Sequence, residues 1–268
     1  GYAALRTNTN GGNKTAVGYR AIEDKTTASD NTAVGRVSMT QNTTGVSNCA
    51  LGQGSLESNT TGSRNVAIGV GALDTQTTAD NNVAVGYYAL TANTTGVNNV
   101  GVGNSALAAN TTANHNIGVG WQALLVNTTG SGNIAIGGYA LHANTTAHNN
   151  TAIGVHALDA NTTANDNTAV GYSAMEENTT GTGNVAVGHD ALEKNTTSSN
   201  NTAIGLEALH VNTGEQNTAV GYNALDANTT GDNNTAIGLN ALGANTTADN
   251  NTAVGYHSLL SNTTGTQN

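Results

Sequence analysis

The chain of 268 residues is poor in the side chains from which most globular cores and charged interfaces are built. It has no Pro, no Phe and one Cys, and only 9% of its residues are charged. Seven Lys and Arg against seventeen Asp and Glu argue against nucleic acid as a partner, because phosphate contacts need basic side chains. The lack of Pro argues against collagen, and no apolar run approaches the ~20 residues of a membrane span.

The sequence is instead dominated by a repeat of 17 residues. Its consensus is Asn-Thr-Ala-Val-Gly-Tyr-x-Ala-Leu-x-Ala-Asn-Thr-Thr-Gly-x-x, and we take the first Gly as the origin of each coil. The origin is Gly1, Gly18, Gly35, Gly52, Gly69, Gly86, Gly103, Gly120, Gly137, Gly154, Gly171, Gly188, Gly205, Gly221, Gly238 and Gly255. Every step is 17 residues except the coil at 205–220, which has 16.

The repeat predicts an all-β fold without helices. Each coil offers two short strand segments, Asn-Thr-Ala-Val and Ala-Leu-x-Ala-Asn-Thr, separated by bends that contain Gly. One coil buries almost nothing, so stability must come from stacking. We therefore expect a parallel β-roll, or β-solenoid, of sixteen 17-residue coils with two short strands per coil, forming a single domain over residues 1–268. Neither end carries an atypical capping repeat, which predicts an internal segment of a longer array.

Stacking turns each column of the repeat into a ladder. The apolar residue before the origin Gly and the Leu four positions after it predict the core. The core ladder is expected to comprise Val17, Val34, Ile68, Val85, Ile136, Val170, Val220, Leu90, Leu124, Leu158 and Leu225. The Asn seven positions after the Gly predicts an amide ladder, in which each side chain bonds to its copy in the next coil. Its clearest members are Asn93, Asn110, Asn127, Asn144 and Asn161.

The short coil tests this register. If one residue were lost from a strand, every side chain after it in that strand would point to the opposite face of the sheet. The standard pattern resumes at Thr218, so we expect the turn after Asn212 to absorb the change, with Gly214 supplying a tighter bend. Glu215 and Gln216 should then project into solvent, and Val220 should continue the ladder.

The segments Asn82–Gly86 (N-V-A-V-G) and Asn133–Gly137 (N-I-A-I-G) resemble the N-x-A-I-G signature of head domains in YadA-like trimeric autotransporter adhesins. Related repeats occur in phage tail fibres. The resemblance covers essentially the whole chain, although coils in those heads are commonly shorter. It implies a left-handed parallel β-roll, three chains per assembly, and an adhesive role at the surface of a cell or virion.

No constellation of residues in the sequence indicates catalysis, a cofactor or a metal ion. The seven His lie at several different positions of the coil; His142 with His148 or His156 could meet across coils, but solvated polar side chains are the favoured interpretation. Acidic residues recur five positions after the Gly without the pattern of a calcium-binding solenoid. Cys49 is expected to be a small buried side chain without a disulfide partner. We therefore do not expect an enzyme.

Two columns are candidates for function. The residue after the origin Gly is often aromatic, which predicts an interface at Tyr19, Tyr87, Trp121, Tyr172, Tyr222 and Tyr256. These rings either contact another surface or cover the edge of the thin core. The Asn-Thr-Thr run could present a Thr row of the kind that ice-binding solenoids use, but adjacent residues point to opposite faces, so only one Thr of each pair can face water.

The sequence thus predicts a structural and adhesive repeat segment of an extracellular surface adhesin or fibre. Its expected partners are copies of itself, most simply in a homotrimer, and a host or surface glycan or protein. No nucleic acid and no membrane contact are expected for this segment. Ice binding through the Thr and Asn rows is the alternative.

Overall fold

The computed structural model describes residues 1–24 and 27–268. Lys25 and Thr26, which belong to the Asn and Thr columns, lie outside the described residues. The chain divides into two compact units, residues 1–132 and 133–268. Each unit is a stack of coils, and the single domain expected from the unbroken repeat stays a prediction.

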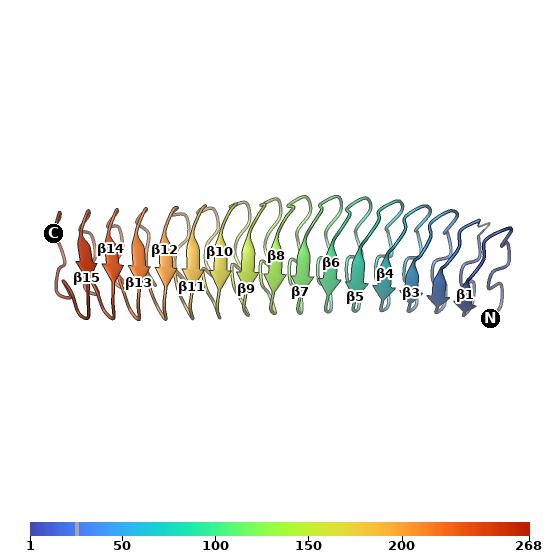
Figure 1. Ribbon diagram of the computed structural model, residues 1–268, viewed down its shortest axis with the longest axis horizontal. Helices are drawn as coiled ribbons and strands as arrows, with labels where there is room; N and C mark the ends of the chain where they lie inside the picture. The colour runs from blue at the N-terminus through green and yellow to red at the C-terminus, as the bar shows by residue number, and fades with distance from the viewer. Residues whose placement is uncertain (25–26) are drawn as a thin grey trace. The chain divides into compact units, whose positions relative to one another are not determined.

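Both units are parallel β-solenoids in which a coil contributes one strand of three residues, and each strand lies beside the strands of the neighbouring coils of its unit (Figure 1). Residues 1–24 and 27–268 contain no helix. The strands of the first unit are β1 (Thr15–Val17), β2 (Thr32–Val34), β3 (Cys49–Leu51), β4 (Val66–Ile68), β5 (Val83–Val85), β6 (Val100–Val102) and β7 (Ile117–Val119). Those of the second unit are β8 (Ile134–Ile136), β9 (Thr151–Ile153), β10 (Thr168–Val170), β11 (Val185–Val187), β12 (Thr202–Ile204), β13 (Thr218–Val220), β14 (Thr235–Ile237) and β15 (Thr252–Val254).

The strands pair in register, so that corresponding residues of neighbouring coils lie opposite each other, as Val83 does with Val100. Each strand is followed by the origin Gly. At Gly86 φ is 142°, and a Cβ there would lie 2.3 Å from the carbonyl oxygen of Gly103 in the next coil. Only Gly tolerates this conformation and this close approach of two backbones. The repeated Gly therefore sets both the bend and the spacing of the coils.

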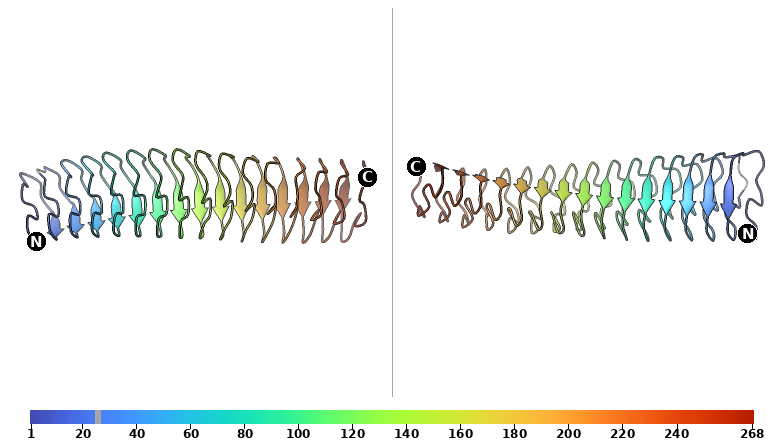
Figure 2. Two further views of the ribbon diagram at one scale, coloured as in Figure 1. Left: turned by 180° about the vertical axis from the view of Figure 1, so that it is seen from behind. Right: turned by 60° about the horizontal axis from the view of Figure 1, so that its bottom comes forward.

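The rest of each coil returns without a second strand, and the return segments carry no arrow in Figure 2. The expected second strand, Ala-Leu-x-Ala-Asn-Thr, is therefore wrong for the described residues. Residues two and four positions after the Gly have positive φ, for example 52° at Tyr88 and 50° at Leu90. A residue in the left-handed region turns the chain and prevents an extended strand. The coils stay hydrogen-bonded along this path, since the Leu90 amide donates to the Ala106 carbonyl at 3.0 Å.

The core of each coil is narrow and consists mainly of Ala, Leu and Asn side chains. The Leu ladder is confirmed as core. Its predicted members Leu90, Leu124, Leu158 and Leu225 are completely buried. The prediction that the residues before the origin Gly belong to the core is wrong, because their side chains project outward and are half-buried or exposed. This correction applies to Val17, Val34, Ile68, Val85, Ile136, Val170 and Val220.

Side-chain alternation explains this correction. The middle residue of each strand, Ala or Gly, points into the coil, so its two neighbours must point outward. The inward Leu leaves no room for a larger residue on the strand. At Gly101 an added Cβ would already lie 3.2 Å from Cγ of Leu90. The interior is therefore too narrow for Val or Ile at that position.

The short coil behaves as its sequence predicts. Val220 lies opposite Ile204 on one side and Ile237 on the other, so the ladder continues without a break. Glu215 and Gln216 are both exposed. The lost residue does not change the facing of any strand in the second unit.

The turn after Asn212 absorbs the deletion. Asn212 donates from Nδ2 to the carbonyl oxygen of Gly214 at 2.7 Å, and its Oδ1 accepts from the Gly214 amide at 3.3 Å. Nδ2 of Asn217 also donates to Asn212 Oδ1, at 3.3 Å. One Asn side chain thus closes the shortened turn.

Candidate functional site

The outer surface of each sheet is the most regular apolar surface of the protein. We define the sheet face as the first and third residues of every strand together with the residue after the origin Gly. No Asp, Glu, Lys or Arg occupies a first or third strand position. Ile136 is 40% exposed on this face, whereas its neighbour Ala135 is completely buried. On the strands the larger apolar side chains thus lie outside and the smaller ones inside, which is the reverse of the usual order in a monomer.

The predicted interface residues form one edge of the sheet face. Tyr19, Tyr87, Trp121, Tyr172, Tyr222 and Tyr256 are between 45% and 74% exposed. Some rings of this row stack along it, as do Tyr2 with Tyr19 at 5.7 Å and Tyr172 with His189 at 5.1 Å between ring centroids. Their exposure fits a contact surface, but their contact with another molecule stays a prediction.

The residues of the sheet face also include Cys49, at the first position of β3. Its side chain is half-buried on the outer face rather than enclosed in the core, so the expectation of a buried Cys is wrong. The reason is again strand alternation, since Ala50 is the residue of β3 that points inward.

The predicted Asn ladder is confirmed within each unit. In the first unit Nδ2 of Asn110 donates to Oδ1 of Asn93 at 3.0 Å, and Nδ2 of Asn127 donates to Oδ1 of Asn110 at 3.0 Å. In the second unit Nδ2 of Asn161 donates to Oδ1 of Asn144 at 3.1 Å. These side chains are completely buried, so each of these hydrogen bonds replaces one that the amide group would form with water in the unfolded chain.

A second Asn ladder was not assigned from the sequence. It is formed by the Asn four positions before the Gly, which is present in every coil except at Lys14. The backbone amide of Asn48 donates to Oδ1 of Asn31 at 2.9 Å, and Asn48 Nδ2 donates to the Gly62 carbonyl at 2.8 Å. The constancy of this Asn in the repeat is the signal that identifies it.

The two Thr of the Asn-Thr-Thr run have different environments. The first is mostly half-buried, and its hydroxyl donates to the carbonyl of its copy in the next coil, as from Thr94 to Thr111 at 3.1 Å. The second is exposed. It forms a row at Thr44, Thr61, Thr78, Thr95, Thr112 and Thr129 in the first unit and at Thr146, Thr163, Thr180, Thr197, Thr230 and Thr247 in the second. The expectation that only one Thr of each pair faces water is confirmed for these coils except two, because Thr196 beside Thr197 and Thr229 beside Thr230 are exposed as well.

Charge is distributed unequally between the two units. Residues 1–132 carry six basic and six acidic side chains, whereas residues 133–268 carry one Lys and eleven Asp and Glu. The whole formal net charge of −10 therefore belongs to the second unit. Six of the seven His also lie there. The second unit is thus the part of the chain that attracts cations.

The acidic and His side chains of the second unit meet between coils, two and five positions after the Gly. Glu193 accepts from Lys194 Nζ at 2.5 Å and lies 2.8 Å from Nε2 of His210. Burial by itself would raise the pKa of Glu193, but the hydrogen bonds with Lys194 and His210 outweigh it and lower that pKa. At Asp226, burial is the dominant effect and raises the pKa of the carboxyl group.

The first unit has a shallow depression of about 330 Å³ at the equivalent positions. Arg20, Arg36, Glu57 and Asp74 are among the residues that line it. Burial raises the pKa of Asp74, and burial together with the charge of Asp74 raises the pKa of Glu57. The depression is open and mixed in charge, and its groups offer no nucleophile and base in contact.

Comparison with models of known protein families gave no match, and a search of curated proteins found no relative. The described residues contain no helix that is long and apolar enough to cross a membrane. The geometry of the chain's own surfaces therefore carries the functional argument.

Proposed function

We propose that the chain is a structural and adhesive repeat segment of an extracellular surface adhesin or fibre, which acts through its regular surface without catalysis. In this proposal it forms left-handed rolls of sixteen coils that assemble as a parallel homotrimer. The sheet face is the observation that carries the proposal. Val and Ile side chains project from strand after strand, and burying them would stabilise an assembly by about 25 cal/mol per Å² of apolar surface.

A second copy of this chain is the occupant that best fits the sheet face. Strands within each unit repeat in register at a spacing of about 4.8 Å, and only a surface with the same spacing can match the rows over many coils. The first and third strand positions carry no charge that would demand a charged partner. A copy of the same face supplies both the spacing and the apolar chemistry.

Three chains suit the narrow width of the face. Each strand presents two outward side chains, so the sheet face of one chain is a narrow strip. Three such strips packed around one axis bury one another's edges, whereas in a dimer the edges of both strips would stay in water. The resemblance of the N-x-A-I-G segments to YadA-like heads implies the same number. The turns and the exposed Thr row would then face outward, where they can contact a glycan or protein on a host or other surface.

Light scattering at micromolar concentration tests the assembly. We expect a particle of three chains of 26.7 kDa each. Replacing Ile153 and Ile204 by Lys should dissociate it, because a charge buried in the shared core has no partner. The control is Thr163→Lys, which adds the same charge on the exposed Thr row and should leave the mass unchanged. A stable monomer for the unaltered chain contradicts the proposal.

Ice binding is the second candidate, and the exposed Thr row is the observation that favours it. Its Thr side chains lie one coil apart on one surface, as at Thr146, Thr163 and Thr180. The neighbouring Thr hydroxyls already bond to carbonyl groups of the next coil, so each coil offers one Thr rather than two. A thermal-hysteresis measurement separates the candidates. Strong activity that is lost in Thr163→Lys would support ice binding over adhesion.

A further inference from the structure

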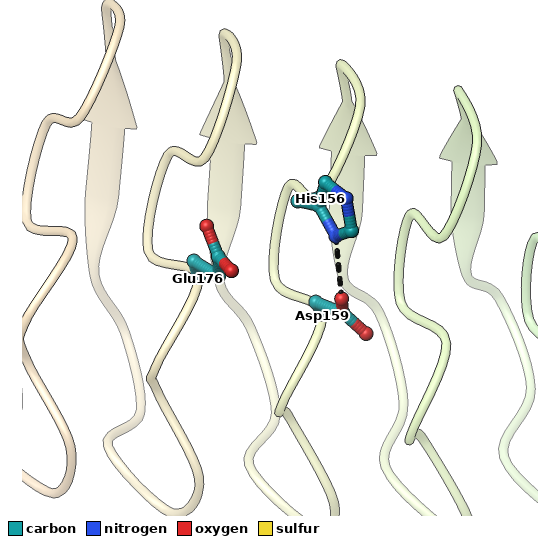
Figure 3. A group of neighbouring side chains, drawn as sticks. All are labelled: His156, Asp159 and Glu176. Carbon is teal, nitrogen blue, oxygen red and sulfur yellow. Dashed lines mark hydrogen bonds and ion pairs between the residues drawn. The ribbon is translucent and has the colours of Figure 1, made fainter.

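A cluster of metal-ligating side chains lies on two neighbouring coils of the second unit. His156 and Asp159 belong to one coil and Glu176 to the next, and Figure 3 shows the three side chains on this surface. One ligand atom from each residue lies within 4.8 Å of the other two. All three side chains are half-buried, so they are partly desolvated but remain open to an incoming ion.

Contacts around the cluster restrict its His side chains. His156 Nδ1 lies 2.7 Å from Asp159 Oδ2, and His142 Nδ1 from the preceding coil lies 3.4 Å from Asp159 Oδ1. The ring of Tyr139 stacks on His156 with centroids 5.1 Å apart and meets His142 edge-on at 5.3 Å. Two imidazoles are thus held beside one carboxylate. The Tyr139 ring, which is outside the proposed ligand set, packs against both imidazoles and limits their rotation.

The neighbouring Glu193–His210 pair provides an internal comparison. There Nζ of Lys194 lies 2.5 Å from a carboxylate oxygen of Glu193 and 2.8 Å from one of Glu177, so the positive charge of Lys194 already neutralises these carboxylates. Lys194 is the only Lys or Arg among positions 133–268. No other Lys or Arg of this unit exists to neutralise Asp159 and Glu176. A bound cation would supply the positive charge that Lys194 supplies to Glu193.

We propose that His156, Asp159 and Glu176 bind a divalent transition-metal ion such as Zn²⁺, with His142 in reach of a fourth position. One imidazole with two carboxylates suits Zn²⁺, whereas Mg²⁺ and Ca²⁺ prefer oxygen ligands alone. Bonds of about 2.0–2.2 Å hold the ligand atoms of a tetrahedral site roughly 3.4 Å apart, so His156 Nδ1 and Asp159 Oδ2, which lie 2.7 Å apart here, must separate to admit the ion. Small rotations of these half-buried side chains, which remain open to solvent, supply that movement. Because the ligands come from two coils, binding also ties the coils together.

Calorimetric titration of the full chain with ZnCl₂, after treatment with a chelator, tests this site. We expect one tight Zn²⁺ per chain and a higher unfolding temperature when Zn²⁺ is present. His156→Gln and Asp159→Asn preserve size and should each weaken binding at least tenfold and abolish the thermal shift. The matched control is His210→Gln, which removes the His of the pair that Lys194 already neutralises and should bind like the unaltered chain.

Three results would overturn the proposal. The first is no binding at millimolar Zn²⁺. The second is equal weakening by His210→Gln and His156→Gln, which would indicate diffuse attraction to an acidic surface. The third is displacement of Zn²⁺ by an equal concentration of Mg²⁺, which would show that the imidazole is not a ligand.

Discussion

Gly137 and Gly138 are adjacent in the sequence but differ in the side chain they can accept. Gly137 is an origin Gly with φ of 137°, and a Cβ there would lie 2.3 Å from the carbonyl oxygen of Gly154. At Gly138 a Cβ would meet nothing within 4 Å. We expect Gly137→Ala to lower the free energy of unfolding by about 2 kcal/mol or more, through backbone strain and separation of the coils. Gly138→Ala should change it by less than about 0.5 kcal/mol.

Urea denaturation of both variants measures this difference. Equal destabilisation would show that the origin Gly is not required for close approach of the coils. The comparison isolates one Cβ, because both substitutions add the same atom one residue apart.

Gln76 interrupts the Asn ladder and leaves an acceptor without a donor. In a regular coil, Nδ2 of Asn110 donates both to Oδ1 of Asn93 and to the carbonyl of its own turn. The longer Gln76 donates to the Ala79 carbonyl at 3.0 Å, but Oδ1 of the preceding Asn59 is buried without a partner. We expect Gln76→Asn to raise the free energy of unfolding by about 1 kcal/mol, because it restores that donor.

The reverse substitution, Asn110→Gln, is the matched control and should destabilise the chain by a similar amount. Thermal unfolding of the two variants checks both directions. If Gln76→Asn gave no gain, the ladder bond would contribute nothing beyond what water supplies to the unfolded chain.

At the scale of a coil, the shortened turn leaves a similar defect. Asn212 uses its Nδ2 on Gly214, and Oδ1 of Asn195 in the preceding coil is buried without a partner. Inserting one Thr between Thr213 and Gly214 restores the Asn-Thr-Thr-Gly run. Oδ1 of Asn212 already accepts from Nδ2 of Asn228 at 2.7 Å. We expect the insertion to add the missing bond from Asn212 Nδ2 to Asn195 Oδ1 and to raise the free energy of unfolding by about 1 kcal/mol.

An insertion of Thr between Glu215 and Gln216 gives the same coil length without the consensus run. It should not stabilise the chain, and differential scanning calorimetry of the two insertions distinguishes them. Equal gains would mean that coil length alone, rather than the Asn ladder, determines the stability of this turn.

The repeat predicts those features of a coil that one local rule decides. Gly at a fixed position predicts the bend, constant Asn predicts the ladder, and the resumption at Thr218 predicts an unbroken register. The second strand was not predictable, because Leu90 adopts a φ of 50° that Leu avoids in isolation and accepts here inside a packed coil.

The direction in which the Val and Ile side chains of the strands point also could not be predicted from the sequence. In a strand of three residues such as Ile134–Ile136, alternation alone gives two solutions, and hydrophobicity favours the wrong one. The space left by the inward Leu decides between them, and that space is a tertiary property. The His156 cluster likewise depends on which turn positions meet across coils, so spacing within one coil does not identify it.

At the scale of the whole chain, the partition of charge makes the proposed parallel assembly dependent on salt. Parallel chains align each second unit, residues 133–268, with its copies, and each copy has a formal charge of −10. Repulsion among them opposes the contact of the sheet faces. Raising NaCl from about 20 to about 300 mM shortens the screening length from about 20 Å to about 6 Å. We therefore expect sedimentation equilibrium to show tighter assembly at the higher salt concentration.

The control for this prediction removes charge without touching the sheet face. Asp166 and Glu215 are exposed turn residues of the second unit. Replacing them by Asn and Gln should tighten assembly at low salt and reduce its dependence on NaCl. Assembly that loosens as salt rises would therefore contradict the parallel trimer, even if three chains are found.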